Sequence, residues 1–168
     1  AVNKALGRAR YADDLCFEGM LYASAVRSEY PRARVLSIDI GAAQKEPGVV
    51  AVLTAADIPG DQKIGHLVQD YDVLIPIGGL THFLGDAIAL VVAESPEALE
   101  RGKALVQVGY EPLPPILSPK DAMEAAAPRV HEERDNLLAH YRVCRGGADA
   151  AIENAAHVVT NRYSLPFT

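Results

Sequence analysis

The sequence predicts a mixed α/β (α+β) fold, with a mixed sheet built from strand–helix–strand units and with a C-terminal arm. Two observations predict it. Apolar runs of strand length flank short helical segments twice, over residues 33–54 and 85–110. After Pro115 this pattern stops, and charged, irregular sequence follows. We therefore expect a domain over residues 1–118 and an extended arm over residues 119–168.

The first half of the chain predicts three strands, over residues 20–27, 33–40 and 49–54. A short helix over residues 41–46 joins the second strand to the third, and Pro47-Gly48 ends it. A helix between parallel strands of one sheet forms a right-handed crossover. We therefore expect the two strand–helix–strand units to share one sheet.

The second unit is the most clearly specified part of the chain. Residues 87–93 are an apolar run of strand length, and Ser95 followed by Pro96 is typical of a helix start. Ala98, Leu99 and Gly102 fall at helical spacing and predict a stripe that faces the sheet. Alternating residues from Val106 to Tyr110 then predict a half-buried strand, which the prolines at 112, 114 and 115 end.

Residues 61–83 lie between the units and show little periodicity. We expect a long irregular excursion, because loops of this length usually have a functional or contact-making role. In the arm, Ser118 predicts a cap for a helix over 119–126, and a second helix is expected over 148–155. The apolar run 156–163 predicts a final strand.

Composition limits the partners that the chain can have. Hydrophobic residues make up 49% of the 168 residues, and Trp is absent, so we expect a core mostly of Ala, Val, Ile and Leu. The formal net charge of −6 argues against nucleic acid and anionic membranes. The longest apolar run is too short to cross a bilayer. Cys16 and Cys144 form no CxxC pattern, so we expect buried, unpaired thiols and a cytoplasmic location.

Most candidate reactive residues have a plain structural interpretation. Asp13-Asp14 suits a solvated turn better than a general acid/base pair. The sequence from His131 to Glu133 lacks the second histidine of a zinc helix, because residue 135 is Asp. The arginines near the start suit ion pairs better than phosphate binding; they are Arg8, Arg10, Arg27, Arg32 and Arg34. We expect no catalytic, cofactor-binding or metal-binding residue in this chain.

One loop remains a candidate site. Gly65, His66, Leu67 and His82 stand toward the two ends of the segment 65–84, and long loops beside rigid sheets often contact ligands. We expect this loop to border a substrate entrance. A small hydrolase that uses His66 or His82 is an alternative, which alanine variants of both histidines would test.

An ordered series of short segments resembles the large, molybdenum-binding subunit of the xanthine dehydrogenase/aldehyde oxidase family. The series covers nearly the whole chain and comprises 7–14, 20–21, 25–28, 31–35, 47–49, 53–60, 85–86, 91–95, 110–114 and 162–163. Gly109 and Gly146-Gly147 depart from the family's usual residues. In that family this region is the N-terminal α/β hammerhead domain, so the resemblance implies a hammerhead-type sheet.

The resemblance implies that this chain is a fragment of a molybdenum hydroxylase, with xanthine dehydrogenase favoured and purines such as xanthine or hypoxanthine as substrates. The implied parent enzyme uses a molybdenum–pyranopterin cofactor, [2Fe–2S] clusters and FAD, none of them bound by this chain. Implied partners are the remaining molybdenum-cofactor domains and the iron–sulfur and FAD domains or subunits. The fragment by itself should be inactive, and strand 156–163 should pair with itself or fold back.

Two further interpretations stay open. Aldehyde oxidase, or a related molybdenum hydroxylase, fits the same resemblance. A stand-alone, non-catalytic binding or scaffold module fits the residues without any parent enzyme. The sequence that follows Thr168 would separate these possibilities, because only the molybdenum hydroxylases require several hundred further residues with glycine-rich cofactor loops.

Overall fold

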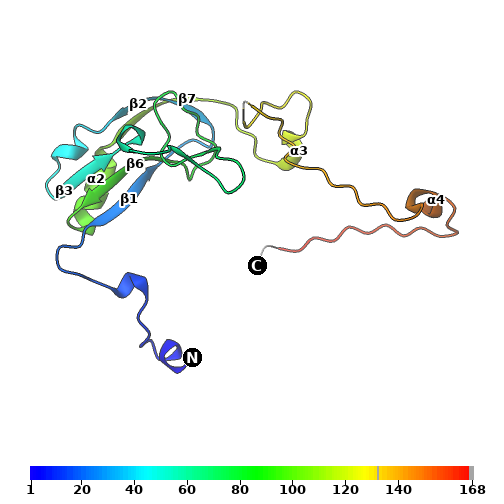
Figure 1. The fold of residues 1–168 in the computed structure, drawn as a ribbon, viewed down its shortest axis with the longest axis horizontal. Helices are drawn as coiled ribbons and strands as arrows, with labels where there is room; N and C mark the ends of the chain where they lie inside the picture. Colours follow the sequence, from blue (N-terminus) through cyan, green and yellow to red (C-terminus); the bar gives the residue numbers. More distant parts are fainter. Residues whose placement is uncertain (132, 167–168) are drawn as a thin grey trace. The chain divides into compact units, whose positions relative to one another are not determined.

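The computed structural model describes residues 1–131 and 133–166 and divides into two compact units. The first, Ala1–Leu117, contains all the strands found among the described residues, and we call it the sheet unit. The second, Ser118–Thr168, contains two short helices, and we call it the arm. Figure 1 shows strands β1, β2, β3, β6 and β7 grouped together in the sheet unit.

Two antiparallel sheets form the body of the sheet unit. The first has three strands in the order β1-β6-β3, with bounds Tyr22–Arg27, Ala87–Ala93 and Val49–Leu53. The second pairs β2, Ala33–Asp39, with β7, Gln107–Pro112. The five strands lie within two residues of their expected positions, and β6 has the expected bounds. The mixed α/β class is confirmed.

The expected crossovers on a shared sheet are wrong. The first strand–helix–strand unit runs from β2 through the 3₁₀ helix η2, Ala43–Lys45, to β3, but β2 and β3 belong to different sheets. The second unit runs from β6 through helix α2, Pro96–Leu105, to β7, which are also in different sheets. β2 pairs with β7, and β3 pairs with β6, so the two strand–helix–strand units interlock. Local periodicity identifies a strand but carries no information about its distant partner.

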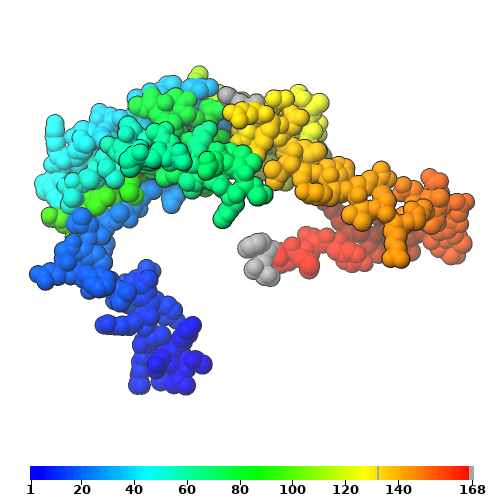
Figure 2. Space-filling view, in the orientation of Figure 1, coloured from blue at the N-terminus to red at the C-terminus, as the bar shows by residue number. Residues whose placement is uncertain are grey.

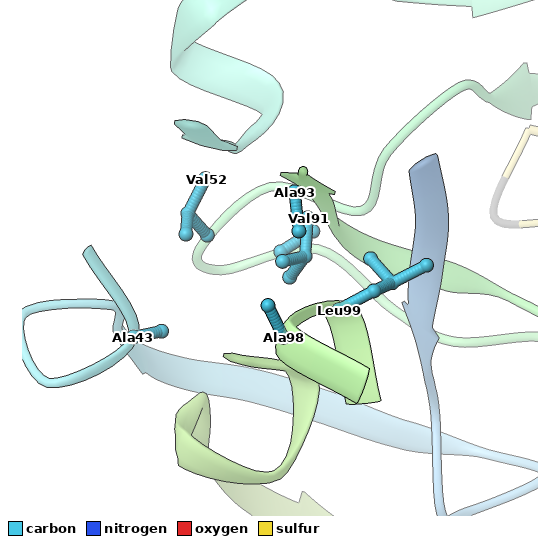
Figure 3. Packing of buried hydrophobic residues seen from close by; sticks show 7 residues of the cluster. Ala43, Val52, Val91, Ala93, Ala98 and Leu99 are labelled. Atoms are coloured by element: carbon cyan, nitrogen blue, oxygen red, sulfur yellow. The ribbon is translucent and has the colours of Figure 1, made fainter. Parts of the chain in front are cut away.

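Helix α2 covers one face of the three-stranded sheet. Its start is as predicted: the Ser95 hydroxyl accepts the Ala98 N–H at 3.2 Å, and Pro96 is the first helical residue. Ala98, Leu99 and Gly102 are its buried residues, which confirms the predicted stripe. Figure 3 shows Ala98 and Leu99 beside Val91 and other small aliphatic side chains of the same cluster. The expected aliphatic core is confirmed here.

Strand β6 contributes to two cores because its side chains alternate between faces. Ala89, Val91 and Ala93 belong to the cluster that includes Ala98 and Leu99 of α2. Ile88 points the other way and packs with Val35 and Ile75 in a second cluster. The second cluster joins the first sheet to the inner face of the β2–β7 sheet, since Ile38, Val108 and Tyr110 also pack against it.

The remaining elements are short. Helix α1 spans Val2–Ala5, and the 3₁₀ helices η1 and η3 span Ala12–Asp14 and Ala55–Asp57. Strands β4, Lys63–Ile64, and β5, Tyr71–Asp72, form a third small sheet. None of the helices found in the described ranges is long and apolar enough to cross a membrane.

The arm contains less regular structure than predicted. Helices α3, Pro119–Ala122, and α4, Ala148–Glu153, begin where expected but end earlier. The cap is confirmed, because the Ser118 hydroxyl accepts the Asp121 N–H at 3.1 Å. The strand expected over 156–163 is wrong, since these residues have no strand pairing within the described chain. An apolar extended run becomes a strand only when a second strand supplies its hydrogen bonds.

Candidate functional site

The excursion before β6 is more ordered than its sequence indicates. Its first part is a small antiparallel hairpin in which Lys63 pairs with Asp72 and Ile64 with Tyr71. The Val73 N–H donates to the Gln62 carbonyl at 2.9 Å and extends the pairing by one step. We call residues 62–73 the entrance hairpin, after the expectation that this loop borders a substrate entrance. Its strands are too short for periodicity to reveal them, so the expectation of an irregular loop is wrong here.

The tip of the entrance hairpin contains three of the four candidate residues. A Cβ added to Gly65 would collide with the Val68 carbonyl oxygen, so this tight turn requires glycine. His66 and Leu67 follow, and the Leu67 side chain is 99% exposed. Figure 2 shows this part of the chain, in green-cyan, at the surface. The tip therefore presents an apolar side chain to solvent from a fixed backbone.

The fourth candidate, His82, lies beside a buried carboxylate. Asp86 is 2% exposed, and its Oδ2 accepts the backbone N–H groups of His82 at 2.5 Å and of Phe83 at 3.4 Å. The imidazole Nδ1 of His82 is 3.8 Å from the same oxygen. Asp86 thus holds the turn 82–86 closed and sets the position of His82. The sequence feature that could have indicated this role is an aspartate directly before the apolar strand 87–93 and four residues after a histidine.

Tyr71 connects the entrance hairpin to this carboxylate. Its ring centroid is 6.2 Å from that of Phe83. The pKa of Tyr71 is raised, first by desolvation, then by the negative charge of Asp86 and a hydrogen bond to it, while Arg27 opposes the shift. The ring contact with Phe83 and the nearby Asp86 carboxylate therefore connect β5 to the turn 82–86. The sequence analysis assigned no role in this site to Tyr71 or to Asp86.

The titration of Tyr71 tests this arrangement. Replacing Asp86 by asparagine removes the negative charge, so the pKa of Tyr71 should fall toward its ordinary value of 10.0. Ultraviolet difference titration of D86N against the parent, with Y71F to identify the signal, measures this. An unchanged Tyr71 titration in D86N would contradict the contact.

The sign of the pH effect on stability follows from the same shift. A raised folded-state pKa means that the unfolded state loses the Tyr71 proton first. The contribution of Tyr71 is therefore fully present below pH 10 and is lost as the pH rises through the folded pKa. Urea unfolding in this alkaline window should show a shallower loss of stability for Y71F than for the parent.

Arginine side chains brace the loops around this site. Arg27 donates to the Gly85 carbonyl, and the Ser28 N–H donates to the Asp86 carbonyl at 2.8 Å. Arg34 donates to the Gly78 carbonyl at 2.9 Å and lies 3.7 Å from the Glu111 carboxylate. These arginines hold the connections around the sheets, so the expected ion-pairing role is only part of what they do.

The structure confirms the interpretation of Asp13-Asp14 and overturns that of the two cysteines. Asp14 accepts the Tyr11 N–H at 2.9 Å, so Asp13-Asp14 forms a turn as expected. Cys16 and Cys144 are free but exposed, so the expectation of buried thiols is wrong. Both cysteines lie in segments with few packed neighbours, where an apolar side chain is not enough to cause burial. Residue 132 of the His131–Glu133 segment lies outside the described residues.

The chemistry available to these residues is limited. Across residues 1–131 and 133–166, no group of three His, Cys, Asp or Glu side chains is placed to hold a metal ion. Asp86 uses its carboxylate to close the turn 82–86, and the Tyr71 ring packs near Phe83 of that turn. The geometry therefore describes a rigid support with one projecting tip.

Comparison with known proteins identifies the domain. Residues 6–114 match the family model described as aldehyde oxidase and xanthine dehydrogenase, a/b hammerhead domain. Over 98% of its length, the chain is 36% identical to a probable xanthine dehydrogenase protein of Bacillus subtilis, covering 22% of that protein. It is 33% identical to the nicotinate dehydrogenase large molybdopterin subunit of Eubacterium barkeri, covering 98% of this chain and 38% of the relative.

A solved structure supports the same assignment. Quinoline 2-oxidoreductase from Pseudomonas putida 86 superposes with a TM-score of 0.75 and 33% identity over 94% of this chain and 21% of that one. The chain spans between about one fifth and two fifths of the length of these relatives. The two interlocked sheets, the helix on one face and the match over residues 6–114 lead to one conclusion: the chain belongs to the aldehyde oxidase and xanthine dehydrogenase family and contains its α/β hammerhead domain.

Proposed function

We propose that this chain is the structural N-terminal part of a molybdenum-dependent oxidoreductase that resembles xanthine dehydrogenase and hydroxylates purines. The observation that carries the proposal is the match of 98% of the chain to 22% of a probable xanthine dehydrogenase protein. The chain corresponds to less than a quarter of that relative, and this small share favours a structural role within a larger enzyme. The preference for purines over aldehydes or other substrates rests on that relative's name.

The residues of this chain do not fit the cofactors of such an enzyme. A [2Fe–2S] cluster needs four thiolate or imidazole ligands, but the two cysteines are exposed on separate segments and the described residues bring no three His, Cys, Asp or Glu side chains together around a metal position. The Gly-Gly pairs at 78–79 and 146–147 lack the spacing of phosphate-cradling loops. We therefore assign the molybdenum–pyranopterin cofactor, the clusters and FAD to other domains or subunits. The arm, residues 119–168, would lead into the cofactor domains.

The test compares the complete protein with the 168-residue chain. The complete protein should contain molybdenum and oxidise xanthine and hypoxanthine, and the isolated chain should do neither. Nicotinate, an aldehyde and carbon monoxide serve as comparison substrates. Turnover of an aldehyde but of neither purine would overturn the substrate and favour the aldehyde oxidase alternative. A reading frame that ends shortly after Thr168 would instead favour a stand-alone scaffold module.

We also propose that the tip of the entrance hairpin borders the substrate entrance, with Gly65 fixing the turn and His66, Leu67 and His82 near the path. Its support is the exposure of Leu67 on a paired hairpin whose Tyr71 packs near Phe83. Substitution of Leu67 by serine should leave the fold intact, because the side chain makes almost no buried contact. In the complete enzyme we expect KM to rise about fivefold with kcat unchanged, equivalent to about 1 kcal/mol of uniform binding.

Leu36 supplies a matched control for this prediction. It is also a leucine with an exposed side chain, at 55%, but it lies in β2, outside the excursion. Steady-state kinetics of Leu36→Ser should match those of the parent. Identical kinetics for Leu67→Ser and the parent enzyme would remove the entrance role.

We also propose that the isolated chain associates with further copies of itself through residues 156–163 of the arm. Val158 and Val159 are 59% and 82% exposed in a segment without strand pairing. Unpaired apolar strands add to another chain readily. Sedimentation of the isolated chain should show association that Val159→Lys weakens and that Ile152→Lys, in α4, leaves unchanged. A monomer at all concentrations would contradict this proposal.

A further inference from the structure

The three-stranded sheet has a second apolar face, opposite helix α2. Alternation along β6 puts Leu90 and Val92 on this face, because Ala89, Val91 and Ala93 pack in the cluster with α2. The strand register then places two neighbours beside each of them. The rows across the sheet are Ala23–Val92–Ala51 and Ala25–Leu90–Leu53. We call these six residues the outer face.

Burial decreases along this side of β6. Ile88 is fully buried, because the second core cluster covers it. Leu90 and Val92, further along the same side, are only partly buried although they occupy the central strand. At the edges, Ala23 is exposed and Leu53 is 38% exposed. The covering layer is therefore complete over Ile88 and incomplete over the two rows beyond it.

The second sheet shows how this protein treats a face that remains in water. On the side of β2–β7 away from its core, Arg34 stands opposite Glu111 and Asp39 opposite Gln107. Arg34 and Glu111 form an ion pair at 3.7 Å. Antiparallel sheets with one face in water have such polar pairs, and the exposed apolar residue of β2 is Leu36 at the bulge. The outer face of the first sheet has six apolar residues and no polar one, which is the composition of a sheet covered on both faces.

We propose that the outer face is an interdomain docking surface, and that its occupant is the part of the same polypeptide that follows Thr168. The inference rests on the proposed function, which makes this chain part of a longer enzyme subunit. The chain spans 22% to 38% of the two curated relatives, so in a protein of that kind most of the polypeptide lies outside it and can supply a covering layer. The three alanines of the rows let such a layer approach closely, and Leu53, Leu90 and Val92 supply apolar area.

Hydroxyl-radical footprinting of the complete protein tests this directly, because it needs no activity. The rate of labelling at Leu53 and Leu90 is measured in the native protein and in urea and expressed as a ratio. We expect Leu53 to be protected to the level of Val52, its 4% exposed neighbour in β3. Labelling at the level of a residue that is 38% exposed would overturn the proposal. Protection that grows with protein concentration would also overturn it, because a second copy would then be the occupant.

A pair of lysine variants in the complete protein provides a second measurement. Leu53→Lys should lower the melting temperature by about 5 °C, because it buries an unpaired charge under the covering layer. Gln107→Lys places the same side chain on the polar face of the second sheet and should leave the melting temperature unchanged. Equal effects of the two substitutions would mean that the outer face is open to water.

The outcomes separate this inference from the proposed function. A molybdenum-containing, active protein with an accessible Leu53 refutes the docking surface alone. A protein without molybdenum whose Leu53 is covered at every concentration refutes the proposed function and supports the docking surface. A reading frame that ends close to Thr168 removes the occupant and refutes both.

Discussion

Replacement of Asp86 by alanine should lower the free energy of unfolding by about 3 kcal/mol, because it removes a buried carboxylate and leaves two part-buried N–H donors without their acceptor. The carboxylate is 2% exposed and accepts the N–H groups of His82 and Phe83. It also interacts with the Tyr71 hydroxyl of the entrance hairpin. The loss should therefore loosen the turn 82–86 and the hairpin together. Urea unfolding followed by circular dichroism measures the free energy, and amide exchange of residues 62–73 measures the loosening.

Asp39 provides the matched control. Its carboxylate also accepts a backbone N–H within a turn, that of Gly41 at 2.9 Å, but Asp39 is exposed. Water replaces the lost acceptor there, so Asp39→Ala should cost about 1 kcal/mol or less. Equal losses for the two variants would show that the burial of Asp86 contributes nothing to its role.

Replacement of Gly102 by valine should also destabilise the sheet unit by about 3 kcal/mol, the upper part of the usual range for overpacking. A Cβ at Gly102 would lie 2.7 Å from Cγ2 of Val49 and 3.1 Å from Cγ1 of Val91. Both neighbours are β-branched and stiff, so they cannot turn away without displacing helix α2 from the sheet. The clash outweighs the roughly 0.5 kcal/mol that valine gains over glycine in helix propensity.

Glu100→Val separates packing from propensity. It introduces the same residue into the same helix, at a side chain that is 69% exposed and pairs with Lys103 at 2.9 Å. We expect a loss of about 1 kcal/mol, from propensity and the surface ion pair. Thermal unfolding of the two variants measures the difference. A Gly102→Val protein as stable as the Glu100→Val protein would refute the close approach of α2.

The sequence predicted helix α2 and strand β6 well because their signals are local. Ser95 and Pro96 act on the backbone next to them, and the stripe of Ala98, Leu99 and Gly102 lies within about two turns of the helix. Strand pairing could not be predicted in the same way. β2 meets β7 and β3 meets β6 across tens of residues, and antiparallel and crossover arrangements use the same apolar runs. The run 156–163 shows the converse, since strand composition without a partner gives no strand.

The candidate site was predicted only in part. The tip residues Gly65, His66 and Leu67 and the separate His82 were selected for the length of the excursion, which is a general reason. No site role was predicted for Asp86 or Tyr71, because an isolated aspartate or tyrosine has the same appearance in a sequence whether it is buried or exposed. Their importance comes from the burial of Asp86 and from the hydrogen bonds that converge on it.

By itself, the sequence determined the mixed α/β class, the positions of the main strands and helix, and the family to which the chain belongs. These depend on local preference and on the order of short segments, both of which are written along the chain. Only the tertiary structure decided that the two strand–helix–strand units pair with each other, that Asp86 closes the turn 82–86, and that the sheet has an uncovered apolar face. These depend on which distant residues meet, and that is set by the free energy of the whole packed arrangement.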